Sequence, residues 1–185
     1  MSDSLYLSRR ALLTYLTTGS AGLLLPQSAL AALSPQPEKT LALYNLHTGE
    51  SLSTTFCSTQ GYDQGSLAAI NKILRDHRSN QQCAMDIELL EVLFQLREKL
   101  DTKQPLHIIS GYRSPETNKM LSQKSNGVAK KSLHMQGKAI DIRVPGVALK
   151  DLHQAALSLQ AGGVGLYTKS DFLHLDVGRV RRWGK

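Results

Sequence analysis

The chain has 185 residues and a formal net charge of +7, with 22 Lys and Arg residues against 15 Asp and Glu residues. This length fits one domain and an additional segment, and the basic excess favours anionic partners through long-range attraction. Basic residues are not interleaved with aromatic residues, so we expect no nucleic-acid partner, and the sequence contains no internal repeat, coiled coil or low-complexity tract.

The first 31 residues have the features of an export signal. Arg9 and Arg10 precede an apolar run that is broken by Pro26 and ends in small residues at Ala31. We therefore predict a twin-arginine signal peptide over residues 1–31 and transport to the periplasm. The alternative is an uncleaved anchor, because the run approaches the ~20 apolar residues that span a bilayer. The proline and the small residues favour cleavage, so we expect no stable membrane anchor after processing.

A proline-containing stretch separates this signal from the domain. Residues 32–40 are predicted to be an extended linker, and residues 41–185 are predicted to form one domain. Within it, two alternating segments at 41–46 and 51–56 flank a turn built on Gly49, which predicts a β-hairpin.

Apolar residues at helical spacing predict three helices. The first begins at Asp63 or Ser66, the second begins at Asp86, and the third covers residues 147–159. We expect the first two to be scaffold.

The two cysteines, Cys57 and Cys83, would meet an oxidising compartment after export. A disulfide and a pair of unpaired buried thiols both remain open, and neither cysteine has the spacing of a metal ligand.

A short buried strand at 106–109 ends at a corner that carries Arg113. Ser114 supplies an N-cap and Pro115 the first helical position, so a helix is predicted to begin directly after the arginine. An arginine at such a corner is well placed to point into a cleft and bind a carboxylate or a carbonyl oxygen. The alternative is a surface salt bridge.

The stretch from Ser132 to Asp141 and the stretch around His174 together predict a metal site. A turn through Gly137 followed by a strand at 138–143 would bring His134 and Asp141 to one point, and a later strand at 172–177 would add His174. Two imidazoles and one carboxylate suit one Zn²⁺ ion, and three protein ligands leave a fourth position for water or substrate. The other histidines have no partner pattern and are expected to be structural, namely His47, His77, His107 and His153.

Two acids near the last histidine are candidates for a general base. Asp176 lies two residues after His174, on the same face of a strand, whereas Asp171 needs a bend to turn inward. We therefore favour Asp176 as the base. The alternative for Asp176 is to orient a ligand imidazole by accepting its other N–H group.

These motifs resemble the zinc D-Ala-D-Ala carboxypeptidase superfamily, which also contains lysostaphin-type peptidases and the hedgehog signalling domain. The resemblance rests on Ser-x-His-x-x-Gly-x-Ala-x-Asp, on the preceding Ser-Gly-Tyr-Arg-Ser and on the late histidine, and it is strongest with the periplasmic murein endopeptidase branch. It implies that His134, Asp141 and His174 bind zinc and that Arg113 binds substrate or the developing oxyanion.

The resemblance also implies hydrolysis of peptidoglycan stem-peptide cross-links, including those that join two diaminopimelate residues. One alternative is a D,D- or L,D-carboxypeptidase or dipeptidase that trims stem peptides. Another is a non-catalytic zinc-bearing module that binds the cell wall. For the fold we expect the α+β class, with a small antiparallel central sheet packed with helices in a single zinc-peptidase domain.

Overall fold

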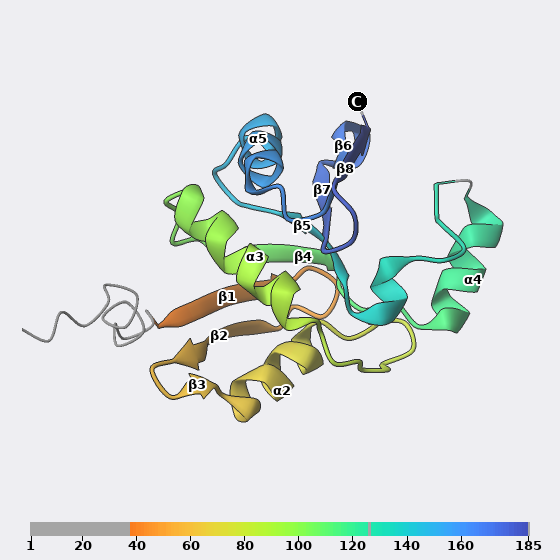
Figure 1. The fold of residues 1–185 in the computed structure, drawn as a ribbon. Helices are drawn as coiled ribbons and strands as arrows, with labels where there is room; N and C mark the ends of the chain where they lie inside the picture. The colour runs from red at the N-terminus through yellow and green to blue at the C-terminus, as the bar shows by residue number, and fades with distance from the viewer. Residues whose placement is uncertain (1–37, 126, 185) are drawn as a thin grey trace, which may run out of the picture. The chain divides into compact units, whose positions relative to one another are not determined.

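A computed structural model describes residues 38–125 and 127–184 of the chain (Figure 1). The predicted signal peptide and most of the predicted linker lie outside the described residues. The strands are β1 (Lys39–Asn45), β2 (Ser51–Ser58), β3 (Gly61–Tyr62), β4 (Leu106–Ser110), β5 (Ala139–Arg143), β6 (Gly163–Tyr167), β7 (Phe172–Asp176) and β8 (Arg181–Gly184). The helices are α2 (Gln64–Ile73), α3 (Ile87–Lys99), α4 (Pro115–Lys124) and α5 (Leu149–Leu159), with short 3₁₀ turns η1 (Leu133–Gln136) and η2 (Thr168–Ser170). The α+β class is confirmed.

The eight strands form one mixed sheet in the order β3-β2-β1-β4-β5-β7-β6-β8. Most neighbours are antiparallel, but β1 pairs in parallel with β4 and β6 pairs in parallel with β8. The sheet is therefore larger than the expected small sheet and is not purely antiparallel. A parallel pair needs a crossover connection, and between β1 and β4 the chain supplies it through the β2–β3 hairpin and the helices α2 and α3.

One face of the sheet is covered by α2, α3 and α5, whereas α4 stands apart near the ends of the central strands (Figure 1). The core lies between the sheet and these three helices, and it contains alternate residues of the central strands, such as Ile140, Ile142, Leu173 and Leu175. Because strand residues alternate between faces, the residues between them point to the opposite side. This second side carries the polar residues singled out in the sequence.

The predicted starts of three helices are confirmed by their caps, whereas the helix predicted over 147–159 begins at Leu149 without a capping side chain. The carboxylate of Asp63 accepts a hydrogen bond from the backbone N–H of Ser66, and Asp86 and Ser114 cap α3 and α4 in the same way. These caps satisfy N–H groups that have no partner within the helix. The predicted hairpin is also present, as the antiparallel pair of β1 and β2.

The thiols of Cys57 and Cys83 are unpaired. Cys57 is buried in β2, and Cys83 is partly exposed in the loop before α3. Of the two alternatives left open by the sequence, the structure therefore shows free thiols.

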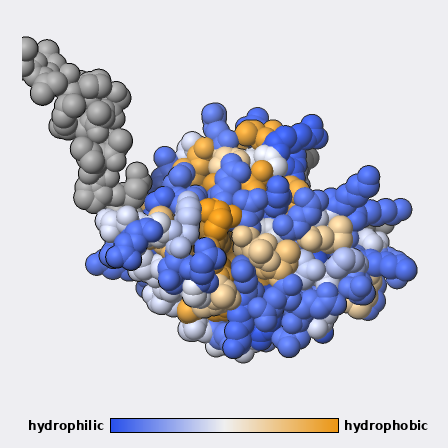
Figure 2. Space-filling model, turned by 60° about the horizontal axis from the view of Figure 1, so that its bottom comes forward, coloured by the Kyte–Doolittle hydropathy of each residue, from blue (hydrophilic) through white to orange (hydrophobic). Residues whose placement is uncertain are grey.

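No helix in the described part of the chain is long and apolar enough to cross a membrane. On the face shown in Figure 2, hydrophilic residues predominate and apolar residues gather only in small groups between them.

Candidate metal centre

Local structure brings His134 to the sheet. It lies on η1, which Ser132 caps and which ends at Gly137 in the left-handed conformation with φ of 67°. A Cβ atom at Gly137 would lie 2.4 Å from the carbonyl oxygen of Ala84, so only glycine fits this turn. The turn sends the chain directly into β5, which carries Asp141.

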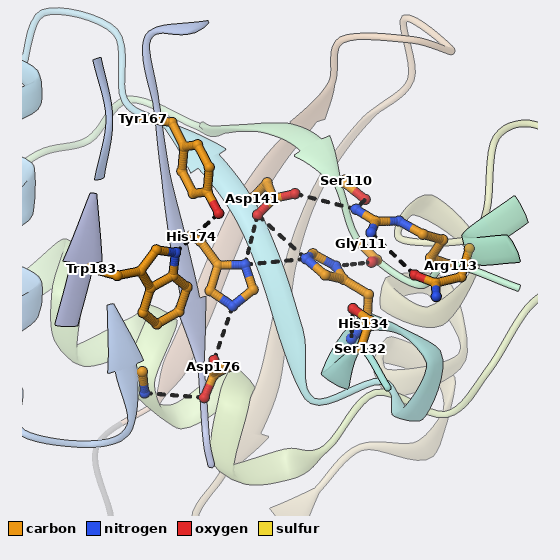
Figure 3. Close-up of polar contacts among 12 residues, drawn as sticks. Ser110, Gly111, Arg113, Ser132, His134, Asp141, Tyr167, His174, Asp176 and Trp183 are labelled. Atoms are coloured by element: carbon orange, nitrogen blue, oxygen red, sulfur yellow. Dashed lines mark hydrogen bonds and ion pairs between the residues drawn. The ribbon is translucent and has the colours of Figure 1, made fainter. Parts of the chain in front are cut away.

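Asp141 and His174 are directly opposite each other on β5 and β7, in the middle of the sheet. Their side chains share one face and meet His134 there (Figure 3). His134 is 2% exposed and Asp141 is 7% exposed, so the three groups meet in a largely desolvated place.

The three facing donor atoms are mutually close. His134 Nε2 lies 3.2 Å from His174 Nδ1 and 3.3 Å from Asp141 Oδ1, and His174 Nδ1 lies 2.9 Å from Asp141 Oδ1. Tetrahedral zinc with bonds of about 2.0–2.1 Å places its ligand atoms about 3.3 Å apart. Among the described residues, this triad is the one group of three or more potential ligand side chains whose atoms converge in this way.

Hydrogen bonds fix which ring nitrogens face the centre as acceptors. His134 Nδ1 donates to the carbonyl oxygen of Gly111 at 2.7 Å, and His174 Nε2 donates to Asp176 Oδ2 at 2.9 Å. In the neutral imidazoles the opposite nitrogens therefore present lone pairs. Two lone pairs and a carboxylate then converge without a donor between them, which is the arrangement a cation satisfies.

The titration of the centre reflects the same arrangement. Burial raises the pKa of Asp141, but the neighbouring His134 and His174 together outweigh it and hold that pKa well below its ordinary value. Burial lowers the pKa of His174, but hydrogen bonds to Asp141 and Asp176 outweigh it and raise that pKa above its ordinary value. A proton on His174 Nδ1 therefore competes with a cation for the Asp141 oxygen. The carboxylate is thus kept ionised, as a metal ligand must be.

Asp176 is fully buried, and both of its carboxylate oxygens accept hydrogen bonds. Oδ1 accepts from the backbone N–H groups of Gly163 and Gly178, and Arg181 contacts both oxygens, at 2.9 Å and 2.6 Å. Oδ2 also accepts the Nε2–H of His174. Burial raises the pKa of Asp176, but the hydrogen bonds from His174 and Arg181 hold it well below its ordinary value. These contacts match the alternative in which Asp176 orients a ligand imidazole rather than acts as base.

Asp171 has a different environment. It follows η2 with φ of 49°, its side chain is 66% exposed, and its Oδ2 lies 3.5 Å from Arg143 Nη1. Its chain neighbours Ser170 and Phe172 line the cleft described below. The structure thus brings Asp176 against His174 and leaves Asp171 at the edge of the cleft.

Arg113 lies beside the candidate metal-binding residues, and its N–H donors make only long contacts there. Its side chain is 12% exposed, and Nη2 lies 3.6 Å from Asp141 Oδ2. Its other contacts are also long, 3.3 Å to Ser110 Oγ and 3.5 Å to Asn118 Oδ1, and its Nε has no hydrogen-bond partner. The guanidinium therefore retains donors for an additional oxygen atom.

Two buried residues, Asp76 and Asn118, stabilise the turn between β4 and α4 that carries Arg113, and neither was predicted from the sequence. Asp76 is 2% exposed and accepts from the backbone N–H of Ser114 at 2.9 Å. Asn118 contacts Arg113 and donates to the carbonyl oxygens of Ala129 and Lys130 in the loop that follows α4. Asn118 could have been identified from the sequence, because it lies in the first turn of the helix that begins directly after Arg113.

A cleft of about 460 Å³ opens over the centre. One wall comes from Ser125 and from residues of the segment 127–133. The other carries Tyr167 and Trp183, whose Nε1 donates to the Tyr167 hydroxyl at 3.0 Å (Figure 3). Trp183 thus lies in the lining of the cleft.

The remaining histidines lie away from the centre. His47 and His77 stack on each other with ring centroids 3.8 Å apart, and His107 packs against Tyr44. In the described structure, none of them joins the converging triad.

Comparison with known proteins gives consistent matches. A Peptidase_M15_2 family model, described as peptidoglycan L,D-endopeptidase MepK, matches residues 33–183. The peptidoglycan L,D-endopeptidase MepK of Escherichia coli strain K12 is 43% identical over 181 residues, which cover 98% of this chain and 100% of that protein. A probable peptidoglycan L,D-endopeptidase MepK of Haemophilus influenzae strain Rd is 40% identical over 161 residues, 86% of this chain and 87% of that protein. No solved structure matches the chain.

Proposed function

The chain belongs to the Peptidase_M15_2 family of peptidoglycan L,D-endopeptidases, and we propose that it hydrolyses peptidoglycan cross-links with the help of one zinc ion held by His134, Asp141 and His174. The observation that carries this proposal is the convergence of His134 Nε2, His174 Nδ1 and Asp141 Oδ1 to within 3.3 Å of one another, while the other ring nitrogens are engaged by Gly111 and Asp176. The nitrogen and oxygen donor set and the spacing of the three atoms fit zinc, and three protein ligands are typical of catalytic zinc sites. The substrate class follows from the names of the relatives.

Zinc in this site would polarise the scissile carbonyl and lower the pKa of water to ~7. The protein residues supply the rest. Arg113 makes only long contacts through its Nη groups beside Asp141, so we assign these groups to the oxygen on which negative charge develops during attack. Because the guanidinium of Arg113 is largely buried, its attraction to that negative charge is stronger than the attraction within a solvent-exposed charge pair.

Proton transfer needs a carboxylate that is free to accept a proton. Asp176 has both oxygens engaged by Arg181, His174 and backbone N–H groups, which supports an orienting role rather than the base role favoured by the sequence. We therefore propose that Asp176 holds the His174 ring. Asp171, exposed at the edge of the cleft, is then the candidate base.

The function is tested with purified mature protein and cross-linked murein, by resolving the released fragments. We expect the cross-linked dimers to be converted to monomers, complete inhibition by a chelator, and recovery on adding back about one equivalent of zinc. Release of single terminal residues without loss of dimers would instead indicate a carboxypeptidase. Hydrolysis that persists in protein shown to be metal-free would overturn the zinc assignment, and binding to murein without hydrolysis would support a binding module.

We also propose export to the periplasm by the twin-arginine route, since a peptidoglycan cross-link lies in the cell envelope. The support is the pair Arg9 and Arg10 ahead of the apolar run. Replacing both with Lys should leave unprocessed precursor in the cytoplasm. Normal processing of that double variant would rule out this route.

A further inference from the structure

A row of side chains crosses the sheet on the face that carries the metal-binding residues. Strand register brings its members side by side, since Tyr44 pairs with His107, His107 pairs with Arg143, and Phe172 pairs with Tyr167. Ile142 pairs with Leu173, so Arg143 and Phe172 are neighbours. This row lies two residues along β5 from Asp141, about 6.6–6.8 Å at the backbone.

Arg143 is the cation of this row, and its donors are poorly satisfied. Its Nε is buried and has no hydrogen-bond partner among the described residues, so a ligand from outside reaches the Nη groups instead. Its Nη1 contacts Asp171 only at 3.5 Å, between side chains that are 42% and 66% exposed. Arg181, by contrast, contacts Asp176 at 2.6 Å. A guanidinium that is anchored on a rigid strand and retains free donors is suited to bind a planar carboxylate from outside.

The proposed substrate carries such a group. An L,D bond joins the carbonyl of an L-centre to the nitrogen of a D-centre. In a cross-link between two diaminopimelate residues, that D-centre also bears a carboxyl group that neither peptide chain uses. The free carboxylate is therefore attached to the carbon next to the scissile nitrogen.

We propose that Arg143 binds this free carboxylate and so makes it a determinant of substrate choice. The inference rests on the proposed function, because it takes the scissile bond to lie at the zinc site. Arg113, closer to the metal-binding residues, then remains available for the carbonyl oxygen. A bound carboxylate would also compete with Asp171 for the Arg143 guanidinium.

The first test measures binding without catalysis. The ligand is a synthetic amine-side product, a stem peptide whose diaminopimelate D-centre carboxyl group is either free or converted to a carboxamide. The zinc-loaded protein should bind the free acid about 10- to 100-fold more tightly, as expected for a hydrogen bond to a charged group. Arg143→Gln should remove that preference with zinc content unchanged, whereas Arg143→Lys should retain part of it.

The control is Arg182→Gln, which makes the same charge change. Arg182 is exposed and lies between Arg181 and Trp183 on β8, so its side chain points to the other face of the sheet. It should keep the full preference for the free acid.

The second test compares kcat/KM for the matching pair of cross-linked peptides. We expect Arg143→Gln to lower kcat/KM for the free acid about 10- to 100-fold more than for the amide, because any change at Asp171, which contacts Arg143, acts on both peptides alike. Equal loss on both peptides, or no preference in the wild-type protein, overturns the inference while hydrolysis itself stands. A binding preference that depends on Arg143 in a protein that hydrolyses neither peptide supports the inference and overturns the proposed reaction.

Discussion

Replacing Asp176 with Asn separates an orienting residue from a base. The substitution keeps the shape and one acceptor oxygen but removes the charge that faces Arg181 and His174. If Asp176 orients the His174 ring, the variant should lose zinc affinity and stability together. If Asp176 is the base, it should lose turnover alone.

The magnitudes follow from the contacts. Removing one partner of a buried ion pair costs about 3–5 kcal/mol. Asp176 is fully buried, but the Arg181 side chain is 32% exposed and can be rehydrated, so we expect roughly 2–3 kcal/mol of lost stability. For a domain of this size that is a decrease in Tm of about 4–12 °C. Loss of the bond to the ligand histidine should weaken zinc binding about 10- to 100-fold.

The assay combines a zinc titration, thermal unfolding and murein hydrolysis, with Asp171→Asn as the comparison. At saturating zinc, the Asp176→Asn variant should recover a substantial part of its activity, whereas Asp171→Asn should bind zinc normally and stay inactive. An Asp176→Asn variant with wild-type zinc affinity and no turnover would refute the orienting role. It would return the base to Asp176.

Three further predictions concern the same region. Arg113→Lys should retain zinc but lose roughly 100-fold in kcat, because a point charge cannot replace the planar guanidinium; an unchanged rate would assign Arg113 to a surface salt bridge. His134→Ala should abolish zinc binding and hydrolysis while circular dichroism remains native, and activity in that variant would disprove its role as ligand. Asp76→Asn should destabilise the fold by about 1–3 kcal/mol at pH 7. Burial raises the pKa of Asp76 in the folded protein, but hydrogen bonds from Thr117, Arg78 and Ser114 outweigh it and hold that pKa well below its ordinary value. The stabilisation is therefore complete above about pH 4 and decreases gradually at lower pH. A wild-type advantage in urea unfolding that does not shrink at all between about pH 6 and pH 2 would contradict this reasoning.

Features set by local sequence were predictable. Helix starts at Asp63, Asp86 and Ser114 were predicted because a capping side chain bonds to the backbone two or three residues away. The convergence of His134 and Asp141 was predicted for a similar reason, since one glycine turn separates them along the chain.

Features that depend on contacts between residues far apart in the sequence could not be predicted in the same way. The strand β8 was not predicted from the sequence, yet it pairs in parallel with β6. That pairing brings Arg181 to Asp176, and this contact is the main support for the proposed orienting role of the acid. The role of Asp76 was missed because its partner Ser114 is 38 residues away.

The site is formed partly by strands of the sheet and partly by a loop, and related enzymes can therefore change one part without the other. Asp141 and His174 lie on central strands, whereas one wall of the cleft is a connecting segment, tied to α4 through Asn118. Insertions or exchanges in that segment change which chains can enter while leaving the floor of the cleft intact. Grafting it from a relative of different selectivity should therefore transfer the preference for a substrate without altering zinc affinity.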